Sequence, residues 1–92
     1  MDPRDNVLAK NLVQYSCQVQ PGENVYISCN GTAPIPLVKQ IIKEVYAAGA
    51  TPFLEIKTST TERELLLGIQ EKQLNQMAQW ECEKMRAMDA YI

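Results

Sequence analysis

The stretch 24–57, NVYISCNGTAPIPLVKQIIKEVYAAGATPFLEIK, decides the fold of this chain. Its opening residues, 24–29, are β-branched and aromatic, which is typical of a strand. Residues 51–57 predict a second strand, in which Pro52 is tolerated because it opens the strand. The segment between the two strands has the length and periodicity of a helix. We therefore expect a βαβ unit, with parallel strands and a right-handed crossover.

The intervening helix is predicted to begin at Thr32 or Ala33 and to end with Gly49 as its C-terminal cap. Two prolines, Pro34 and Pro36, fit only within its first turn, where no N–H donor is needed. The expected apolar stripe is Ile35, Val38, Ile41, Ile42 and Val45, and the expected solvated side is Lys39, Gln40, Lys43 and Glu44. The first strand alternates Val25, Ile27 and Cys29 with Tyr26 and Ser28, so we expect both of its faces to be at least partly buried.

An N-terminal helix is predicted from about Asn6 to Gln18, with Asp5 or Asn6 as its cap. Its apolar face is expected at Leu8, Leu12 and Tyr15, with Val19 just beyond. The pair Pro21-Gly22 then predicts a turn into the first strand.

After the second strand, Thr61-x-x-Glu64 has the capping-box spacing for a short helix through Leu65–Leu67, interrupted by Gly68. A longer helix is expected from about Glu71 to Met88. Its apolar residues are Leu74, Met77, Ala78, Met85 and Met88, and its solvated residues are Glu71, Lys72, Gln76, Glu83 and Lys84.

The ending Asp89-Ala90-Tyr91-Ile92 is typical of a third strand that has just begun. The sequence thus predicts one α/β domain or partial domain over residues 1–92. Its architecture is a Rossmann-like βαβ unit with parallel strands and flanking helices, truncated as an N-terminal portion. Sheet edges and helix faces left without neighbours favour self-association, so we expect a homo-oligomer.

Composition excludes several classes of protein. Nine basic and 11 acidic residues give a net charge of −2, and no basic block points to a nucleic-acid partner. The basic residues Lys39, Lys43, Lys57 and Arg63 lack interleaved aromatic side chains. Apolar runs such as residues 65–67 are too short to cross a membrane, and the N-terminus lacks the apolar core of a signal peptide. We therefore expect a cytoplasmic chain without a membrane or nucleic-acid partner.

Candidate chemistry is scarce, because the chain contains no histidine. Cys17, Cys29 and Cys82 have no metal-ligand spacing and are predicted to be buried, reduced thiols. The acidic pairs Glu62/Glu64 and Glu81/Glu83 are two residues apart, so they do not face each other on a helix. Glu44 and Glu55 have no partner that the sequence identifies. We therefore predict no catalytic, cofactor-binding or metal-binding residue in this chain.

One loop stays open as a ligand site. Residues 29–32, Cys-Asn-Gly-Thr, follow the first strand, at the sheet edge where open α/β folds bind ligands. Helix N-terminal amides there could hold a phosphate or a carboxylate. Gly31 is its only glycine, however, and no lysine is placed as in a nucleotide-binding P-loop, so an ordinary turn is the competing interpretation. Trp80, with the methionines around it, is predicted to lie in the core or on a docking surface.

The order of segments resembles the start of the thermophilic aminopeptidase family. Residues 8–16 (LAKNLVQYS) are similar to its opening helix, and 19–27 (VQPGENVYI) to its turn and first strand. Residues 44–50 (EVYAAGA) are similar to the helix end before its second strand. Residues 80–85 and 89–92 are similar to its later helix and third-strand entry. The resemblance therefore covers nearly the whole chain, although each motif is structural rather than catalytic.

The resemblance implies a leucyl-type metallo-aminopeptidase with two divalent ions, Zn, Co, Mg or Mn, acting on peptides. Its glutamate, histidine and aspartate ligands, and its catalytic glutamate and tyrosine, come from later parts of the family's chains. None carries over to a residue here. The chain would be a scaffold whose partner is the remaining catalytic portion of its parent. A small stand-alone ligand-binding or interaction module is the alternative.

Overall fold

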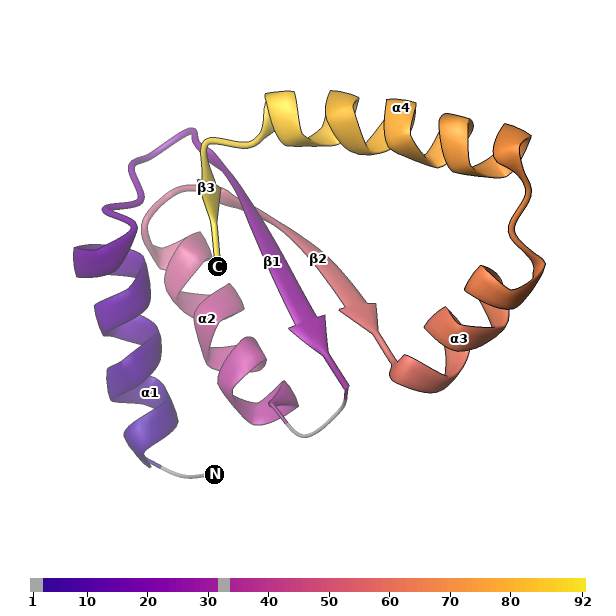
Figure 1. The fold of residues 1–92 in the computed structure, drawn as a ribbon. Helices are drawn as coiled ribbons and strands as arrows, with labels where there is room; N and C mark the ends of the chain where they lie inside the picture. The colour runs from indigo at the N-terminus through magenta and orange to yellow at the C-terminus, as the bar shows by residue number, and fades with distance from the viewer. Residues whose placement is uncertain (1–2, 32–33) are drawn as a thin grey trace.

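The computed structural model describes residues 3–31 and 34–92, so the predicted helix start at Thr32 or Ala33 lies outside the described residues. In chain order the elements are α1 (Pro3–Lys10), the π-helical turn η1 (Asn11–Ser16), β1 (Asn24–Asn30), α2 (Ile35–Ala47), β2 (Thr51–Lys57), α3 (Ser59–Gly68), α4 (Glu71–Ala87) and β3 (Ala90–Tyr91) (Figure 1). The predicted α/β class is confirmed.

The sheet has three parallel strands in the order β2-β1-β3. β1 and β2 pair in register from Asn24 opposite Thr51 to Asn30 opposite Lys57, so both predicted strands and their parallel pairing are confirmed. The predicted third strand is also present: Ala90 lies opposite Val25, and the Ile92 amide donates to the Tyr26 carbonyl at 2.8 Å.

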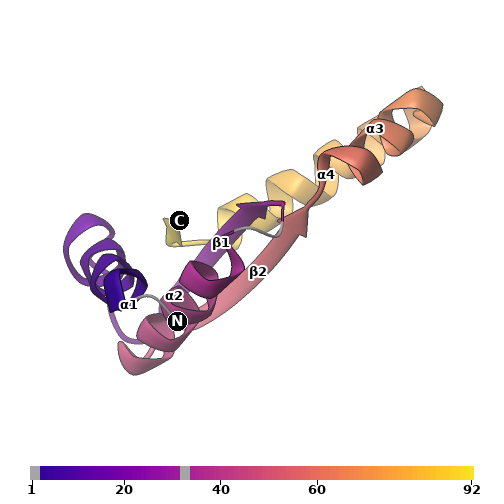
Figure 2. The same ribbon diagram turned by 90° about the horizontal axis from the view of Figure 1, so that it is seen from below.

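The core lies between the sheet and a layer formed by α1 and α2 (Figures 1 and 2). Its largest fully buried side chains are Ile27, Val13, Val25 and Val45, and burying each contributes roughly 1.5–3 kcal/mol. The predicted stripe of α2 is confirmed at Val38, Ile41 and Val45, with Ile35 and Ile42 partly buried. Gln40, expected in solvent, is only 5% exposed, in a helix that packs against α1 as well as against the sheet.

The N-terminal helix buries a different face from the one predicted. Ala9 and Val13 are fully buried, whereas Leu8 and Tyr15 are 45% and 71% exposed. After Lys10 the helix widens into η1, where the Cys17 amide donates to the Leu12 carbonyl, five residues back. A turn widened by one residue changes the helical phase by about 100°. The predicted cap is also wrong, because Asp5 and Asn6 lie inside a helix that already includes Pro3.

The turns that lead into β1 and β2 are joined by a hydrogen bond. Gly49 has a φ of +81° and ends α2 as predicted. Its amide donates to the Tyr46 carbonyl at 2.9 Å, and the Ala50 amide donates to the Val45 carbonyl at 3.1 Å, which is the Schellman pattern. The Gly49 carbonyl in turn accepts from the Gly22 amide at 2.9 Å. This bond ties the Pro21-Gly22 turn to the end of α2.

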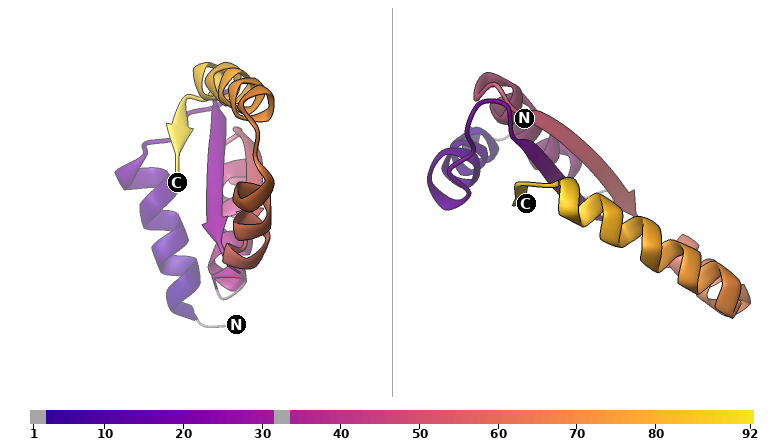
Figure 3. Two further views of the ribbon diagram at one scale, coloured as in Figure 1. Left: turned by 45° about the vertical axis from the view of Figure 1, so that its right-hand side comes forward. Right: turned by 90° about the horizontal axis from the view of Figure 1, so that it is seen from above.

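Helices α3 and α4 form an arm that projects from the sheet, as Figures 2 and 3 show. We call these two helices the α3–α4 arm. The capping-box prediction is wrong, because α3 begins one turn earlier with Thr58 as its cap, and the Thr61 hydroxyl instead donates to the Thr58 carbonyl at 3.0 Å. α4 matches its predicted range within one residue. In the described chain, no helix is both long and apolar enough to cross a membrane.

Most side chains of the α3–α4 arm are exposed in the described structure. On its predicted apolar face, Leu74, Met77 and Ala78 are exposed, and only Met85 and Met88, near the sheet, are partly buried. Trp80 is 62% exposed, so it does not lie in the core. Only the C-terminal part of α4 passes over the sheet, which leaves β2 partly uncovered as well.

Candidate functional site

In the loop after β1, predicted as a possible ligand site, Cys29 and Gly31 form hydrogen bonds within the protein. Gly31, with a φ of +80°, donates its amide to the Lys57 carbonyl at 2.6 Å. The Cys29 thiol donates to the Gly31 carbonyl, with a Sγ–O distance of 3.3 Å. Thr32 lies outside the described residues. The loop is therefore tied to the end of β2, and its Gly31 amide is not available to an anion.

The described start of α2 also offers few hydrogen-bond donors to an anion. Its cap is Pro34, which makes no side-chain hydrogen bond, and Pro36 lies in the first turn. A proline has no N–H to donate. Among the residues described at this helix start, the amides that make a helix N-terminus attractive to phosphate are thus depleted.

The polar cluster that the structure does assemble lies where α4 meets the sheet, on the face opposite α1 and α2. Glu55 on β2 accepts a hydrogen bond from the Tyr26 hydroxyl on β1 and another from the Lys84 ammonium on α4, the latter at 3.0 Å. Lys57 adds a longer ion pair to Glu55, at 3.7 Å. Two expectations are therefore wrong: Glu55 has partners, and Lys84 is half-buried rather than solvated.

Lys84 lies at the centre of this cluster. Its ammonium is 4.5 Å from the centre of the Tyr26 ring and 3.0 Å from a Glu81 carboxylate oxygen. The Tyr91 ring meets Tyr26 edge to face, with centroids 6.3 Å apart, and its hydroxyl donates to the Met85 carbonyl at 2.9 Å. These contacts join β1, β2, β3 and α4 at one place.

The electrostatics of this cluster, which we call the latch, hold its carboxylate and its ammonium in their charged forms. The hydrogen bond from Tyr26, then that from Lys84, holds the pKa of Glu55 below its usual value despite partial burial. Burial lowers the pKa of Lys84, but its hydrogen bonds to Glu81 and Glu55 outweigh this and raise it. At neutral pH the carboxylate is therefore ionised and the lysine protonated, so neither is poised to exchange a proton.

The sequence contained only a faint signal of this cluster. A carboxylate in the middle of a strand that otherwise suits a sheet, as Glu55 is, points to a partner on the same face. Lys84 is 29 residues further along the chain, and no local periodicity indicates which strand residue it meets.

The described residues do not fit a metal centre. In 3–31 and 34–92, no group of three or more histidine, cysteine, aspartate or glutamate side chains lies close enough to hold an ion. The chain has no histidine, and Glu81 is paired with Lys84. A hard divalent ion needs several oxygen or nitrogen donors converging on one point. These residues do not supply them.

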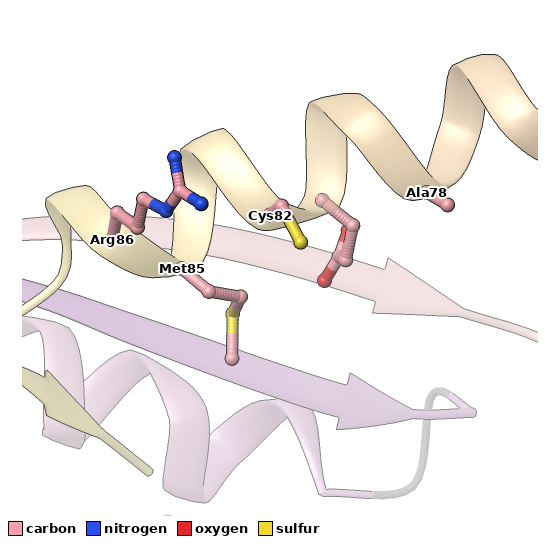
Figure 4. A pocket seen from close by; sticks show the side chains of 5 residues that line it. Ala78, Cys82, Met85 and Arg86 are labelled. Atoms are coloured by element: carbon pink, nitrogen blue, oxygen red, sulfur yellow. The ribbon is translucent and has the colours of Figure 1, made fainter.

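The cysteines are all free, but only Cys29 is buried as predicted. Cys17 is partly exposed, and its thiol lies 3.6 Å from the Tyr91 carbonyl. Cys82 is exposed on α4, which corrects its prediction. Figure 4 shows that Cys82 shares a shallow pocket with Ala78, Met85 and Arg86. All of the lining of this pocket, among the described residues, comes from α4.

Comparison with known proteins adds one match. A model of the family described as thermophilic metalloprotease (M29) matches residues 2–91. A search of curated proteins finds no match. The matched range includes every helix and strand described above.

Proposed function

This chain belongs to the thermophilic metalloprotease (M29) family, and from that premise we propose that it is the N-terminal α/β segment of a metal-dependent aminopeptidase. The parent enzyme would be a leucyl-type, two-metal peptidase in the cytoplasm that removes N-terminal amino acids from peptides. The observation that carries the proposal is the family match over nearly the whole chain. The motifs in 8–16 and 19–27 that resemble the thermophilic aminopeptidases support the finer assignment.

The role proposed for this segment is scaffolding. The described residues do not fit the metals that the family implies, so the two ions, Zn, Co, Mg or Mn, are proposed to bind the remaining catalytic portion of the parent. Metal ions in such enzymes supply a nucleophilic hydroxide and polarise the peptide carbonyl. The part of this segment is to present a rigid parallel sheet, with α1 and α2 packed on one face, next to that portion.

A chimera tests the scaffold role. In an aminopeptidase of this family, the segment equivalent to residues 2–91 is replaced by this chain, and hydrolysis of leucine p-nitroanilide is measured. We expect metal-dependent activity to be retained. A matched chimera carrying Val45→Asp should lose it, because a charge at a fully buried position disrupts the core. A folded but inactive first chimera would contradict the proposal.

A second experiment asks whether the chain has a site of its own. The pure 92-residue protein is assayed on leucine p-nitroanilide with Co²⁺, Zn²⁺ or Mg²⁺ against a metal-only blank. No turnover above the blank is expected, because the described carboxylates and thiols do not converge. Metal-dependent turnover that vanishes in Glu62→Gln or Glu81→Gln would show that the chain itself is catalytic.

A further inference from the structure

The outer edge of β2 has no strand beside it in the described part of the chain. In the order β2-β1-β3, β2 pairs with β1 on one side only (Figure 1). At one end of β2 the Thr51 amide donates to the Glu23 carbonyl at 2.9 Å. At the other end the Lys57 carbonyl accepts from the Gly31 amide at 2.6 Å. Backbone polar groups alternate between the two sides of a strand, so the odd-numbered residues of 51–57 bond to β1 and the even-numbered residues point away from it.

The outward-pointing residues of β2 are therefore Pro52, Leu54 and Ile56. Pro52 has no amide hydrogen, and its position on the outer side explains why the strand tolerates it. Leu54 and Ile56 each direct one N–H donor and one C=O acceptor outward, and no described residue forms a hydrogen bond with these four groups. Such an edge is a template for a further extended chain.

The side chains along this edge are apolar on both faces of the sheet. Phe53 lies on the same face as Glu55, and Leu54 and Ile56 lie on the opposite face. These three apolar side chains are 43%, 45% and 45% exposed. Edge strands usually carry charges that discourage further pairing, but the charge in the middle of β2, Glu55, is bound to Lys84 in the latch. The centre of this edge is therefore open to a partner.

A hollow of about 510 Å³ lies beside this edge, bounded by β2 and the α3–α4 arm. Its apolar lining comes from the arm and consists of Leu65, Leu74, Met77, Ala78 and Trp80. Glu62 on α3 also lines it, and among the described residues its carboxylate forms no ion pair. A strand added to β2 would direct every second side chain towards this hollow. The hollow therefore favours apolar side chains and a basic one.

We propose that the outer edge of β2 binds a peptide substrate of the parent enzyme as an added strand, through the backbone groups of Leu54 and Ile56. This inference rests on the proposed function, which supplies the peptide. An extended peptide has donors and acceptors available along its length, whereas a folded protein covers or blunts most of its strand edges. Main-chain hydrogen bonds give affinity without reading side chains. One broad hollow in place of a row of separate pockets therefore suits a ligand whose sequence varies.

Amide hydrogen exchange of the 92-residue protein tests the added strand directly. The probe is a blocked six-residue peptide that alternates valine with lysine, in large excess. The Leu54 and Ile56 amides should exchange at least tenfold more slowly, because they gain acceptors. The Phe53 and Glu55 amides, which already bond to β1, should slow by less. Unchanged exchange at Leu54 and Ile56 would overturn the proposal, and so would slow exchange that depends on protein concentration without peptide, because a second copy would then occupy the edge.

Two substitutions at Leu54 separate the backbone bond from the side chain. Leu54→Ala and Leu54→Pro both remove the leucine side chain, but only Leu54→Pro removes the outward amide, and neither removes a donor to β1. The fluorescence of Trp80, which lines the hollow, follows the peptide titration. Leu54→Pro should bind the probe at least tenfold more weakly than Leu54→Ala does. Glu62→Gln should weaken binding of the lysine probe but not of the same peptide with threonine in place of lysine. Equal affinities of the two Leu54 variants would overturn the proposal.

Methylated peptides test the same bonds on the unchanged chain, in case Leu54→Pro does not fold by circular dichroism. Successive amides of an extended peptide point to opposite sides, so methylation of the valine nitrogens blocks one edge and methylation of the lysine nitrogens blocks the other. One of these two peptides should bind at least tenfold more weakly than the other, and equal affinities would overturn the proposal. Binding is measured without turnover. Its absence contradicts the edge site alone, whereas an inactive chimera contradicts the proposed function.

Discussion

Gly49 is the position at which the structure makes the sharpest quantitative prediction. Its φ of +81° lies in the left-handed region, where a residue with a Cβ costs roughly 1–2 kcal/mol. A Cβ at this position would also lie 3.3 Å from the Pro21 Cβ and 3.5 Å from the Pro21 Cα. Since Pro21 is held by the turn bonded to Gly49 itself, it cannot move away without disturbing both strand entries. We expect Gly49→Ala to lower the free energy of unfolding by about 2 kcal/mol or more.

Two other glycines separate the cost of backbone strain from the cost of the contact with Pro21. Gly22 has a φ of +83°, but a Cβ added there would meet no atom within 4 Å, so Gly22→Ala should cost only the backbone strain, about 1 kcal/mol. Gly68 ends α3 without positive φ or a close neighbour, so Gly68→Ala should stabilise by roughly 0.5–1 kcal/mol. The order of stability should therefore be Gly68→Ala, unchanged chain, Gly22→Ala, Gly49→Ala.

Urea unfolding followed by circular dichroism measures these differences, at a concentration where sedimentation shows a monomer, because association adds to apparent stability. In a chain of this size 1 kcal/mol corresponds to roughly 4–8 °C in Tm. Gly49→Ala should therefore melt at least about 8 °C lower. If it is no less stable than Gly22→Ala, the contact with Pro21 relaxes freely and the reasoning is refuted.

Three further predictions concern the latch and the core. Lys84→Met should destabilise the chain by about 1 kcal/mol, because an ion pair and a cation–π contact are lost. It should also speed hydrogen exchange of the α4 amides. Lys72→Met, on the exposed part of the same helix, should have neither effect. Glu55 has a lowered pKa in the folded chain, so its stabilisation is present above the unfolded pKa and is lost as pH falls through the folded value. The Tm advantage of the unchanged chain over Glu55→Gln should therefore shrink below about pH 5, and an advantage that is constant with pH would contradict this linkage. Ile27→Ala, at a side chain only 1% exposed, should cost roughly 2–5 kcal/mol in urea unfolding, and a loss below about 1 kcal/mol would show that the core is looser than the burial of Ile27 indicates.

Local signals along the chain are enough to specify the βαβ unit. These signals are the β-branched residues at 24–29 and 51–57, the helical spacing between them and Gly49 after the helix, and all of them favour the same local structure. The parallel pairing follows because strand, helix and strand in that order leave little other choice. The start of β3 and the family resemblance were also visible, since both depend on residues in order along the chain.

Contacts between elements distant in sequence settle which faces these elements use. α1 buries Ala9 rather than Leu8, and α2 buries Gln40, in a structure where these two helices pack against each other. Neither is encoded in the period of a single segment. The Tyr26–Glu55–Lys84 latch and the exposed arm have the same origin, because they depend on where 71–87 lies relative to the sheet. Helical periodicity indicates that a helix has an apolar side, but only the packing of the whole chain determines whether that side is covered.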